Sequence, residues 1–208
     1  MIELFYASTP NGRKISIMLE EIKFDYKITV LDLVKGDQFK PEFRKISPLS
    51  KIPAIIDHKN KISFFQSGAI LIYLAEQSGK FYESDNRNLI NQWIMAQMGD
   101  IGPMLGQHHQ FHHYNPGKSK FGEERYFNIA TRLYNDLDDY LSTSNFLAGE
   151  NYSIADIATF PWIARHDWHD IGLKKFKNLS RWYNNISKRE AVIKGYDCLK
   201  KGDTIPEI

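Results

Sequence analysis

The spacing of hydrophobic residues at the start of the chain predicts a strand, a helix and a second strand. The apolar run from Ile2 to Tyr6 has the length and the large side chains of a strand. Residues 26–30 alternate between apolar and polar positions, which is typical of a half-buried strand. Between these two segments, apolar residues recur at helical spacing at Ile15, Met18, Leu19 and Ile22.

A hairpin and a second helix are predicted next. Residues 54–56 and 62–65 are short apolar segments, rich in β-branched and aromatic residues, and a polar turn separates them. A helix is expected to begin at Ser67, because an apolar stripe follows it at Ile70, Leu71 and Leu74. The α/β unit formed by these elements ends near Gly79.

From about residue 86 the strand pattern gives way to helical spacing. A long helix is expected to begin near Leu89 and to be disturbed between Gly99 and Pro103. Further along, Ser153 and Asp156 have the spacing of a capping box, with Asp156 in place of the usual glutamate. Two more helices are expected near residues 179–188 and 191–199. The pattern therefore predicts two domains, an α/β domain over residues 1–80 and an all-helical domain over residues 87–208.

The composition of the chain limits which partners it is expected to bind and in which cellular compartment it is expected to work. The chain has 208 residues, of which 42% are hydrophobic, and its net charge is only +2, so electrostatics gives no reason to expect a nucleic acid or a membrane as partner. No apolar run approaches the roughly 20 residues that span a bilayer. The single cysteine, Cys198, has no partner for an internal disulfide, which favours a reducing compartment. We expect a cytoplasmic protein.

The segment around Pro53 and Ser67 is the first candidate for a binding site. A serine at a helix start, followed by Gly68, leaves backbone N–H groups free, and these groups and the helix dipole favour a carboxylate or phosphate. If the Ile52–Pro53 bond is cis, Ile52 can offer its N–H and C=O to a peptide lying alongside. A trans proline at the first residue of an edge strand is the commoner arrangement, and the sequence leaves both open.

Three motifs in this order, SKIPAI, QSGAILIYLAE and NYSIADIA, resemble the cytosolic glutathione transferases. More narrowly, TPNGRKISIMLEE, FRKISPLSKIPAI, IGPMLGQ and GENYSIADIA are similar to the Nu class. That class includes bacterial glutathione-dependent disulfide-bond oxidoreductases and is related to a yeast nitrogen-regulatory prion protein. The resemblance implies an α/β thioredoxin-like N-terminal domain with a cis-proline, an all-α C-terminal domain and a homodimer that uses glutathione as co-substrate.

The resemblance also implies which residues bind glutathione. Ile52, preceding Pro53, would pair with the cysteinyl backbone, and Ser67 would hold the γ-glutamyl carboxylate. Gln38 and Arg125 match two further contacts of the class. From the residues alone, Gln38 is an ordinary loop residue, and Arg125 could equally form a surface ion pair with a nearby glutamate.

One departure from the class concerns Gln66, because close relatives have glutamate there. A neutral amide can still accept a hydrogen bond from the γ-glutamyl ammonium, but one charge-assisted bond is weakened. We hypothesise that Asp100 supplies the missing charge across a dimer interface, as an acidic residue does in some other classes.

The loop Ala7 to Gly12 is the candidate for catalysis. Thiolate is the reactive form of glutathione, and a hydrogen bond to a charged group is worth about 1.5–3 kcal/mol, or roughly one to two pKa units. By resemblance, the Thr9 hydroxyl and an amide N–H of Asn11 would stabilise the sulfur. The alternative is that both residues only bond the loop backbone. Tyr6 is no candidate because the register places Phe5 at the position of the tyrosine-type transferases, and Cys198 is far in sequence from this loop.

The histidine-rich segment from His108 to His113 is ambiguous. His108 and His112, or His109 and His113, have the i, i+4 spacing that can present two ligands to zinc, but no third ligand is evident. We therefore predict no metal, and expect His108 and His112 to line the cleft for the second substrate. Trp162, Trp168 and Trp182 are assigned to the core.

Three functions follow from this sequence. The first is reduction of disulfides by the thiolate of bound glutathione, without a protein cysteine. The second is conjugation or peroxide reduction by the same thiolate, which differs only in the electrophile. The third is a regulatory module that binds glutathione without turnover. The presence of Thr9 and Asn11 favours the first two functions.

Overall fold

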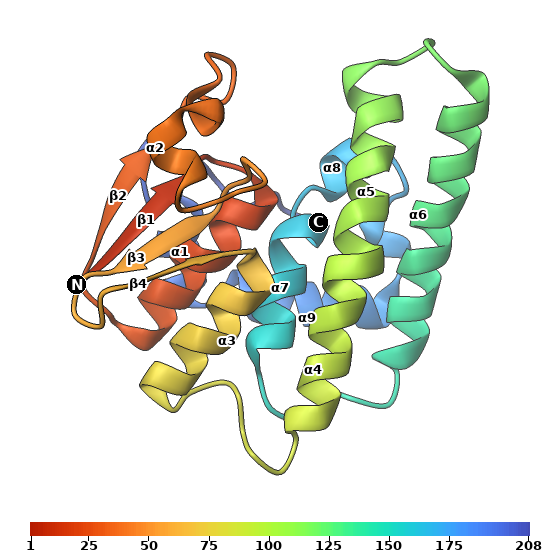
Figure 1. Ribbon diagram of the computed structural model, residues 1–208. Coiled ribbons are helices and arrows are strands. Elements are labelled where there is room, and N and C mark those ends of the chain that lie inside the picture. The colour runs from red at the N-terminus through yellow and green to blue at the C-terminus, as the bar shows by residue number, and fades with distance from the viewer.

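A four-stranded mixed sheet forms the centre of the N-terminal half in the computed structural model, which describes all residues 1–208 (Figure 1). Its strands are β1 (Ile2–Tyr6), β2 (Tyr26–Val30), β3 (Ala54–Asp57) and β4 (Ile62–Phe65). The order is β2-β1-β3-β4, with β1 parallel to β2 and the other two pairs antiparallel. All four strands lie where the hydrophobic pattern predicts them.

Helices of the N-terminal half cover the sheet. The starts of two of them differ from what the sequence predicts. The helices are α1 (Pro10–Ile22), α2 (Pro41–Arg44) and α3 (Ser67–Ser78), with a short 3-10 turn η1 (Asp37–Phe39) before α2. The loop expected to reach Gly12 ends at Thr9, because Thr9 caps α1 and Pro10 suits the first helical position. Helix α3 is preceded by Gln66, so Ser67 is its first residue rather than its cap.

The rest of the chain is helical (Figure 1). Its longer helices are α4 (Arg87–Ala96), α5 (Gly102–His108), α6 (Lys120–Tyr140), α7 (Ile154–Ile163), α9 (Lys177–Ser187) and α10 (Glu190–Tyr196). The predicted disturbance after α4 is a π-helical turn, η2 (Gln97–Ile101), and a second one, η3 (His109–Tyr114), follows α5. The short elements α8 (His166–His169) and η4 (Leu173–Lys175) were not predicted. No helix has the length and apolar character needed to cross a membrane.

The predicted capping box at the start of α7 is confirmed. The Asp156 carboxylate accepts from the Ser153 backbone N–H, and its other oxygen accepts from the Trp182 indole. Leu4 of the sheet and Trp182 of α9 belong to one continuous core of 39 buried residues. Because the two halves share this core, the domain limits stay a prediction.

Helix α1 joins the two halves by packing against α10 and α7. Ser16 donates to the Gly195 carbonyl at 2.6 Å, and the buried Arg13 guanidinium donates to the Tyr196 carbonyl and pairs with Asp203 at 2.8 Å. A Cβ on Gly195 would lie 2.5 Å from the Ile17 Cα. The close approach of the two backbones therefore requires glycine at this position.

Replacing Gly195 with alanine is expected to lower the free energy of unfolding by about 1–3 kcal/mol, because the new methyl group meets rigid backbone of α1. Gly99→Ala is the matched control, since a Cβ there meets nothing within 4 Å. Urea denaturation of both variants measures the difference. Equal stability of the two variants would show that α10 shifts away from α1 at little cost.

Candidate functional site

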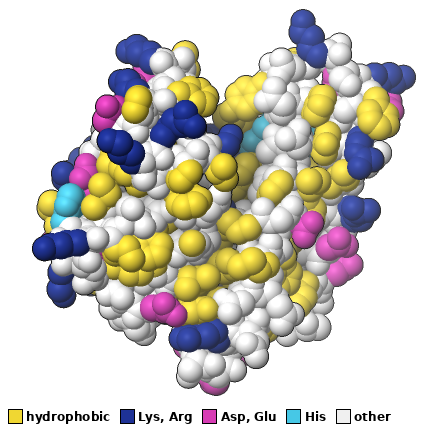
Figure 2. All heavy atoms as spheres, in the orientation of Figure 1, with side chains coloured by type: hydrophobic (Ala, Val, Ile, Leu, Met, Phe, Trp, Pro, Cys, Tyr) yellow, Lys and Arg dark blue, Asp and Glu magenta, His cyan; other side chains and the backbone are white.

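A cleft runs between the sheet half and the helical half, and Figure 2 shows the surface hollowed there. It consists of two adjoining pockets of about 360 and 320 Å³, and both are lined by Asn11, Gly106 and Trp162. We call the first the Ser67 pocket; its other lining residues include Lys14, Gln66, Ser67 and Gln97. We call the second the Thr9 pocket; its other lining residues include Thr9, Gln38, Ile52, His109 and Tyr114.

Thr9 and Asn11 are placed by the first turn of α1, and each has its acceptor oxygen occupied. The Thr9 hydroxyl oxygen accepts from the Gly12 backbone N–H at 3.1 Å. The Asn11 side-chain oxygen accepts from the Trp162 indole N–H at 3.1 Å. The Thr9 O–H and the Asn11 amide N–H groups are therefore left as donors on the wall of the Thr9 pocket.

The Ile52–Pro53 peptide bond is cis, which decides the isomer that the sequence left open. Ile52 lines the Thr9 pocket, and neither its backbone N–H nor its C=O makes a hydrogen bond within the chain. Gln38, from η1, lines the same pocket. The Gln38 amide nitrogen donates to the Leu33 carbonyl, while its oxygen is buried without a partner. This wall thus offers backbone and amide groups to a peptide-like ligand.

The start of α3 forms the end of the Ser67 pocket. Gln66 has φ of 73°, in the left-handed region that non-glycine residues rarely adopt, and such strain is often found at binding sites. The backbone N–H groups of Ser67 and Gly68, in the first turn of α3, make no backbone hydrogen bond. This helix start keeps the free amide groups that the sequence predicts for a carboxylate.

Lys14 is a buried cation in this pocket that the sequence reading missed. Its ammonium donates to the Gln97 side-chain oxygen at 2.5 Å and to the Ser67 hydroxyl at 3.4 Å, and no carboxylate pairs with it. Burial lowers the pKa of Lys14 well below its ordinary value. The Gln97 amide nitrogen is buried without a partner. The pocket therefore favours an anion that would complete these contacts.

The histidine prediction is wrong for His108. His108 is fully buried, its Nε2 donates to the His169 carbonyl at 2.8 Å, and it lines neither pocket. His112 stacks on the His108 ring and also lies outside both pockets. His109 lies one turn after Gly106 on the same face of the helix, and these two residues line the Thr9 pocket. No three metal-ligating side chains gather into a group that could hold an ion.

Arg125 and Asp100 lie together in another place. Both are exposed and line a groove of about 480 Å³ formed by α4, η2, α5 and α6, which shares no residue with the cleft. Arg125 therefore does not join the other predicted contacts within one chain. The hypothesis that Asp100 reaches a ligand on a second copy stays a prediction.

The two residues that the sequence excludes as catalytic groups, Tyr6 and Cys198, lie outside the cleft. Tyr6 is fully buried, with its hydroxyl unpartnered beneath the start of α1, and burial raises its pKa above the ordinary value. Cys198 follows α10, lines neither pocket, and its thiol pKa is raised by burial. A raised pKa means less thiolate, so this cysteine is poorly suited to be a nucleophile.

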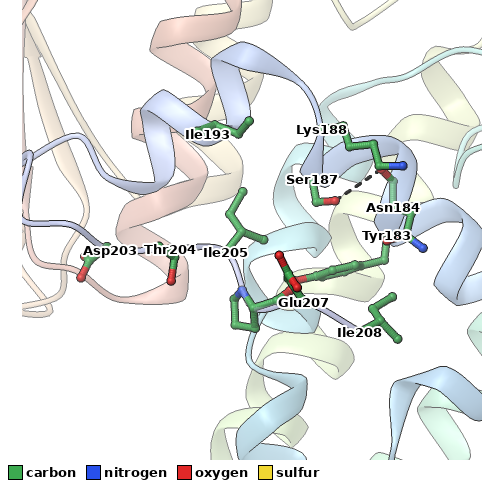
Figure 3. Close-up of a pocket in the computed structure, with 11 residues that line it drawn as sticks. Tyr183, Asn184, Ser187, Lys188, Ile193, Asp203, Thr204, Ile205, Glu207 and Ile208 are labelled. Atoms are coloured by element: carbon green, nitrogen blue, oxygen red, sulfur yellow. Dashed lines mark hydrogen bonds between the residues drawn. The ribbon is translucent and has the colours of Figure 1, made fainter.

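A further hollow, of about 520 Å³, lies at the C-terminal tail (Figure 3). The tail from Asp203 to Ile208 lies across α9 and α10, and Tyr183 donates to the Pro206 carbonyl at 2.6 Å. None of its lining residues lines the cleft, and none was a predicted site residue. The hollow is formed by the C-terminal tail and the surfaces of α9 and α10 against which the tail is held.

Some missed residues did leave a signal in the sequence. Lys14 lies four positions before Met18, and Gln97 continues the spacing of Ile90 and Ile94, so each is a polar residue on an apolar helix face. Trp162, assigned to the core, is 9% exposed and reaches both pockets, while Trp182 is core as predicted.

Comparison with known proteins relates this site to one family. The model of the glutathione S-transferase N-terminal domain matches residues 2–76, and that of the C-terminal domain matches residues 114–190. The chain is 46% identical over 199 residues to the disulfide-bond oxidoreductase YfcG of Escherichia coli, covering 92% of this chain and 93% of that protein.

Two solved structures are similar in fold and sequence. A glutathione transferase from Burkholderia graminis, with two glutathione molecules bound per subunit, has a TM-score of 0.90 and 38% identity, covering 97% of this chain and 89% of that one. One from Pseudomonas putida, with one glutathione disulfide bound per subunit, has a TM-score of 0.87 and 40% identity, covering 94% and 90%.

Replacing Lys14 with methionine is expected to stabilise the free protein at neutral pH, because a buried cation without an acid partner is removed. The folded pKa of Lys14 is lowered, so between that value and 10.5 the unfolded chain binds more protons and stability rises with pH. The variant should lose this rise. Urea denaturation near pH 7 and near pH 9 measures it, with exposed Lys80→Met as control. Parallel pH curves for wild type and Lys14→Met would contradict the burial argument.

Proposed function

This chain belongs to the glutathione S-transferase family, and from that premise we propose that it reduces disulfide bonds with glutathione, using no cysteine of its own. The observation that carries the proposal is the pair of free donors, the Thr9 O–H and the Asn11 amide, on one wall of the cleft. A relative named as a disulfide-bond oxidoreductase and relatives with bound glutathione or glutathione disulfide support it.

In the proposed complex, glutathione lies along the cleft with its sulfur at the start of α1. Its cysteinyl backbone pairs with the free N–H and C=O of Ile52, as the cis Pro53 bond allows. Its γ-glutamyl carboxylate lies at Ser67 on the free amide groups of α3, within reach of the Lys14 ammonium. Gln66 accepts from the γ-glutamyl ammonium, and Gln38 contacts the other end of the tripeptide.

The charges of the cleft suit this ligand. Neither pocket is lined by an acidic side chain, while Lys14 lines one pocket and Lys51 the other. Glutathione carries a carboxylate at each end, so each could lie near one lysine. A buried or half-buried pair gains more from such complementarity than an exposed one does.

The proposed reaction is thiol–disulfide exchange. The Thr9 hydroxyl and the Asn11 amide stabilise the glutathione thiolate, which attacks one sulfur of the substrate disulfide. A glutathione–substrate mixed disulfide forms, and the second substrate sulfur leaves as a thiolate. A second glutathione thiolate then attacks the glutathione sulfur of the mixed disulfide, releasing the other substrate thiol and glutathione disulfide. Two electrons pass from two glutathiones to the substrate, and no protein sulfur changes its oxidation state.

One set of assays separates this proposal from the alternatives. The purified chain with glutathione is tested against a small-molecule disulfide, an aryl halide and a hydroperoxide. Dominant disulfide turnover that persists in Cys198→Ala supports the proposal. Dominant turnover of the aryl halide or hydroperoxide would favour a conjugating enzyme or peroxidase, and binding without turnover would favour a regulatory module.

Replacing Thr9 with valine is expected to lower kcat/KM for disulfide reduction about 10- to 100-fold and to raise the pKa of the bound thiol by about one to two units. The loss arises because valine keeps the shape of threonine but removes the donor to the sulfur, together with the cap that accepts from the Gly12 N–H. Thr9→Ser keeps both the donor and the cap of α1 and serves as the control. Ultraviolet titration of the thiolate in the complex measures the pKa.

Replacing Asn11 with aspartate is expected to lower activity at least as much. Aspartate keeps the acceptor for the Trp162 indole but replaces the free amide donor with negative charge, which opposes an adjacent thiolate. Steady-state kinetics and the same thiolate titration measure the effect. An unchanged thiol pKa in both Thr9→Val and Asn11→Asp would exclude this part of the mechanism.

A further inference from the structure

A row of three buried side chains ends at the Thr9 pocket. Tyr134 of α6 lies with its hydroxyl 2.6 Å from Nδ1 of His169, at the end of α8. Nε2 of His169 lies 2.8 Å from Nε2 of His109, the first residue of η3. Tyr134 and His169 are fully buried, and His109 is 5% exposed. These residues come from three separate elements, so the row exists only in the folded chain.

One arrangement of protons leaves the buried Tyr134 O–H with a hydrogen bond. The Tyr134 hydroxyl has no other acceptor in the chain, so it donates to Nδ1 of His169. His169 then carries its own proton on Nε2 and donates it to Nε2 of His109. His109, with Nε2 acting as acceptor, must carry its proton on Nδ1. The row therefore selects one of the two neutral tautomers of His109.

Burial keeps all three groups neutral. Burial raises the pKa of Tyr134 well above the ordinary value of a tyrosine. It lowers the pKa of His169 well below the ordinary value of a histidine. Burial, with further contributions from His108, Arg165 and His113, lowers the pKa of His109 to about 3. His109 is thus a neutral imidazole across the physiological range.

Nδ1 of His109 makes no hydrogen bond within the chain, and the residue lines the Thr9 pocket. The His109 ring stacks on Trp162, with centroids 5.8 Å apart, and the Trp162 indole holds Asn11. His109 therefore brings an N–H donor from the helical half to the pocket whose other donors, Thr9 and Asn11, come from α1.

We propose that His109 donates its Nδ1–H to the sulfur that leaves during disulfide exchange, and that His169 and Tyr134 are positioning residues that hold it in this tautomer. The inference rests on the proposed function. During exchange the new bond forms between the attacking sulfur and one substrate sulfur, the substrate S–S bond breaks, and negative charge moves to the departing sulfur. A neutral donor stabilises that charge without transferring a proton, and the thiolate takes its proton later from water.

The kinetic test compares disulfides with different leaving thiols. In His109→Phe, kcat/KM with hydroxyethyl disulfide, whose leaving thiol is basic, is expected to fall about 10- to 100-fold. With an aryl disulfide that has nitrobenzoate leaving groups, the fall should be under about threefold, because that thiolate needs little stabilisation. His112→Phe, which removes an imidazole outside the row, is the matched control. The thiol pKa of bound glutathione should not change in His109→Phe.

Two kinetic results would overturn the proposal. Equal losses with both disulfides would mean that His109 acts on the attacking sulfur or on the fold, and no loss with either would mean that it makes no contact with the departing sulfur. If the wild-type chain reduces no disulfide, the proposed function fails, and the tautomer of His109 is then tested alone.

Nitrogen-15 NMR of histidine-labelled protein makes that test. His109 is expected to show a protonated Nδ1 and an unprotonated Nε2 at neutral pH. Tyr134→Phe removes the donor that orients His169 and should convert His109 to a mixture of tautomers, with a smaller version of the same substrate-dependent loss. A wild-type His109 protonated on Nε2 would contradict the assignment, whatever the activity of the enzyme.

Discussion

The candidate site depends on how closely α1 is held between the two halves of the molecule. Its start fits against the end of β1, where a Cβ on Gly12 would lie 2.3 Å from the Ala7 carbonyl oxygen, and farther along it meets α10 at Gly195. The first turn is therefore closely packed against the end of β1. Thr9, Asn11 and Lys14 lie on or beside this turn, so the positions of the proposed sulfur donors and of the buried cation are set by the same packing that joins the halves.

The cleft offers hydrogen bonds mainly from neutral groups whose other partners are already fixed. Thr9 is held by its cap, Asn11 by the Trp162 indole and His109 by His169. Such groups need little rearrangement when charge develops on a sulfur, which is the condition under which electrostatic stabilisation is most effective. A neutral donor also has no need to gain or lose a proton as pH changes.

Local signals predicted most of the fold and the part of the site formed by loops and helix starts. Thr9, Ile52 and Ser67 adjoin turns or helix starts that a few neighbouring residues specify, and the motifs around them suggested their roles. The His108 prediction failed because the i, i+4 spacing of the histidines does not tell which face of the helix is turned to the cleft, and that face carries Gly106 and His109. The row from Tyr134 through His169 to His109 spans three elements far apart in sequence, so only tertiary packing reveals it.

The absence of acidic side chains from the cleft bears on the effect of having glutamine rather than glutamate at position 66. With glutamate there, the Ser67 pocket would carry its own carboxylate, whereas with Gln66 its only ionisable lining side chain is Lys14. A buried ammonium without an acid partner is costly, and an arriving carboxylate removes that cost while it binds. In the proposed complex, the contact of residue 66 to the ligand's ammonium is thus weaker, and the attraction of the pocket to its carboxylate is stronger. On this argument Lys14, rather than residue 66, supplies the main electrostatic attraction for the γ-glutamyl end.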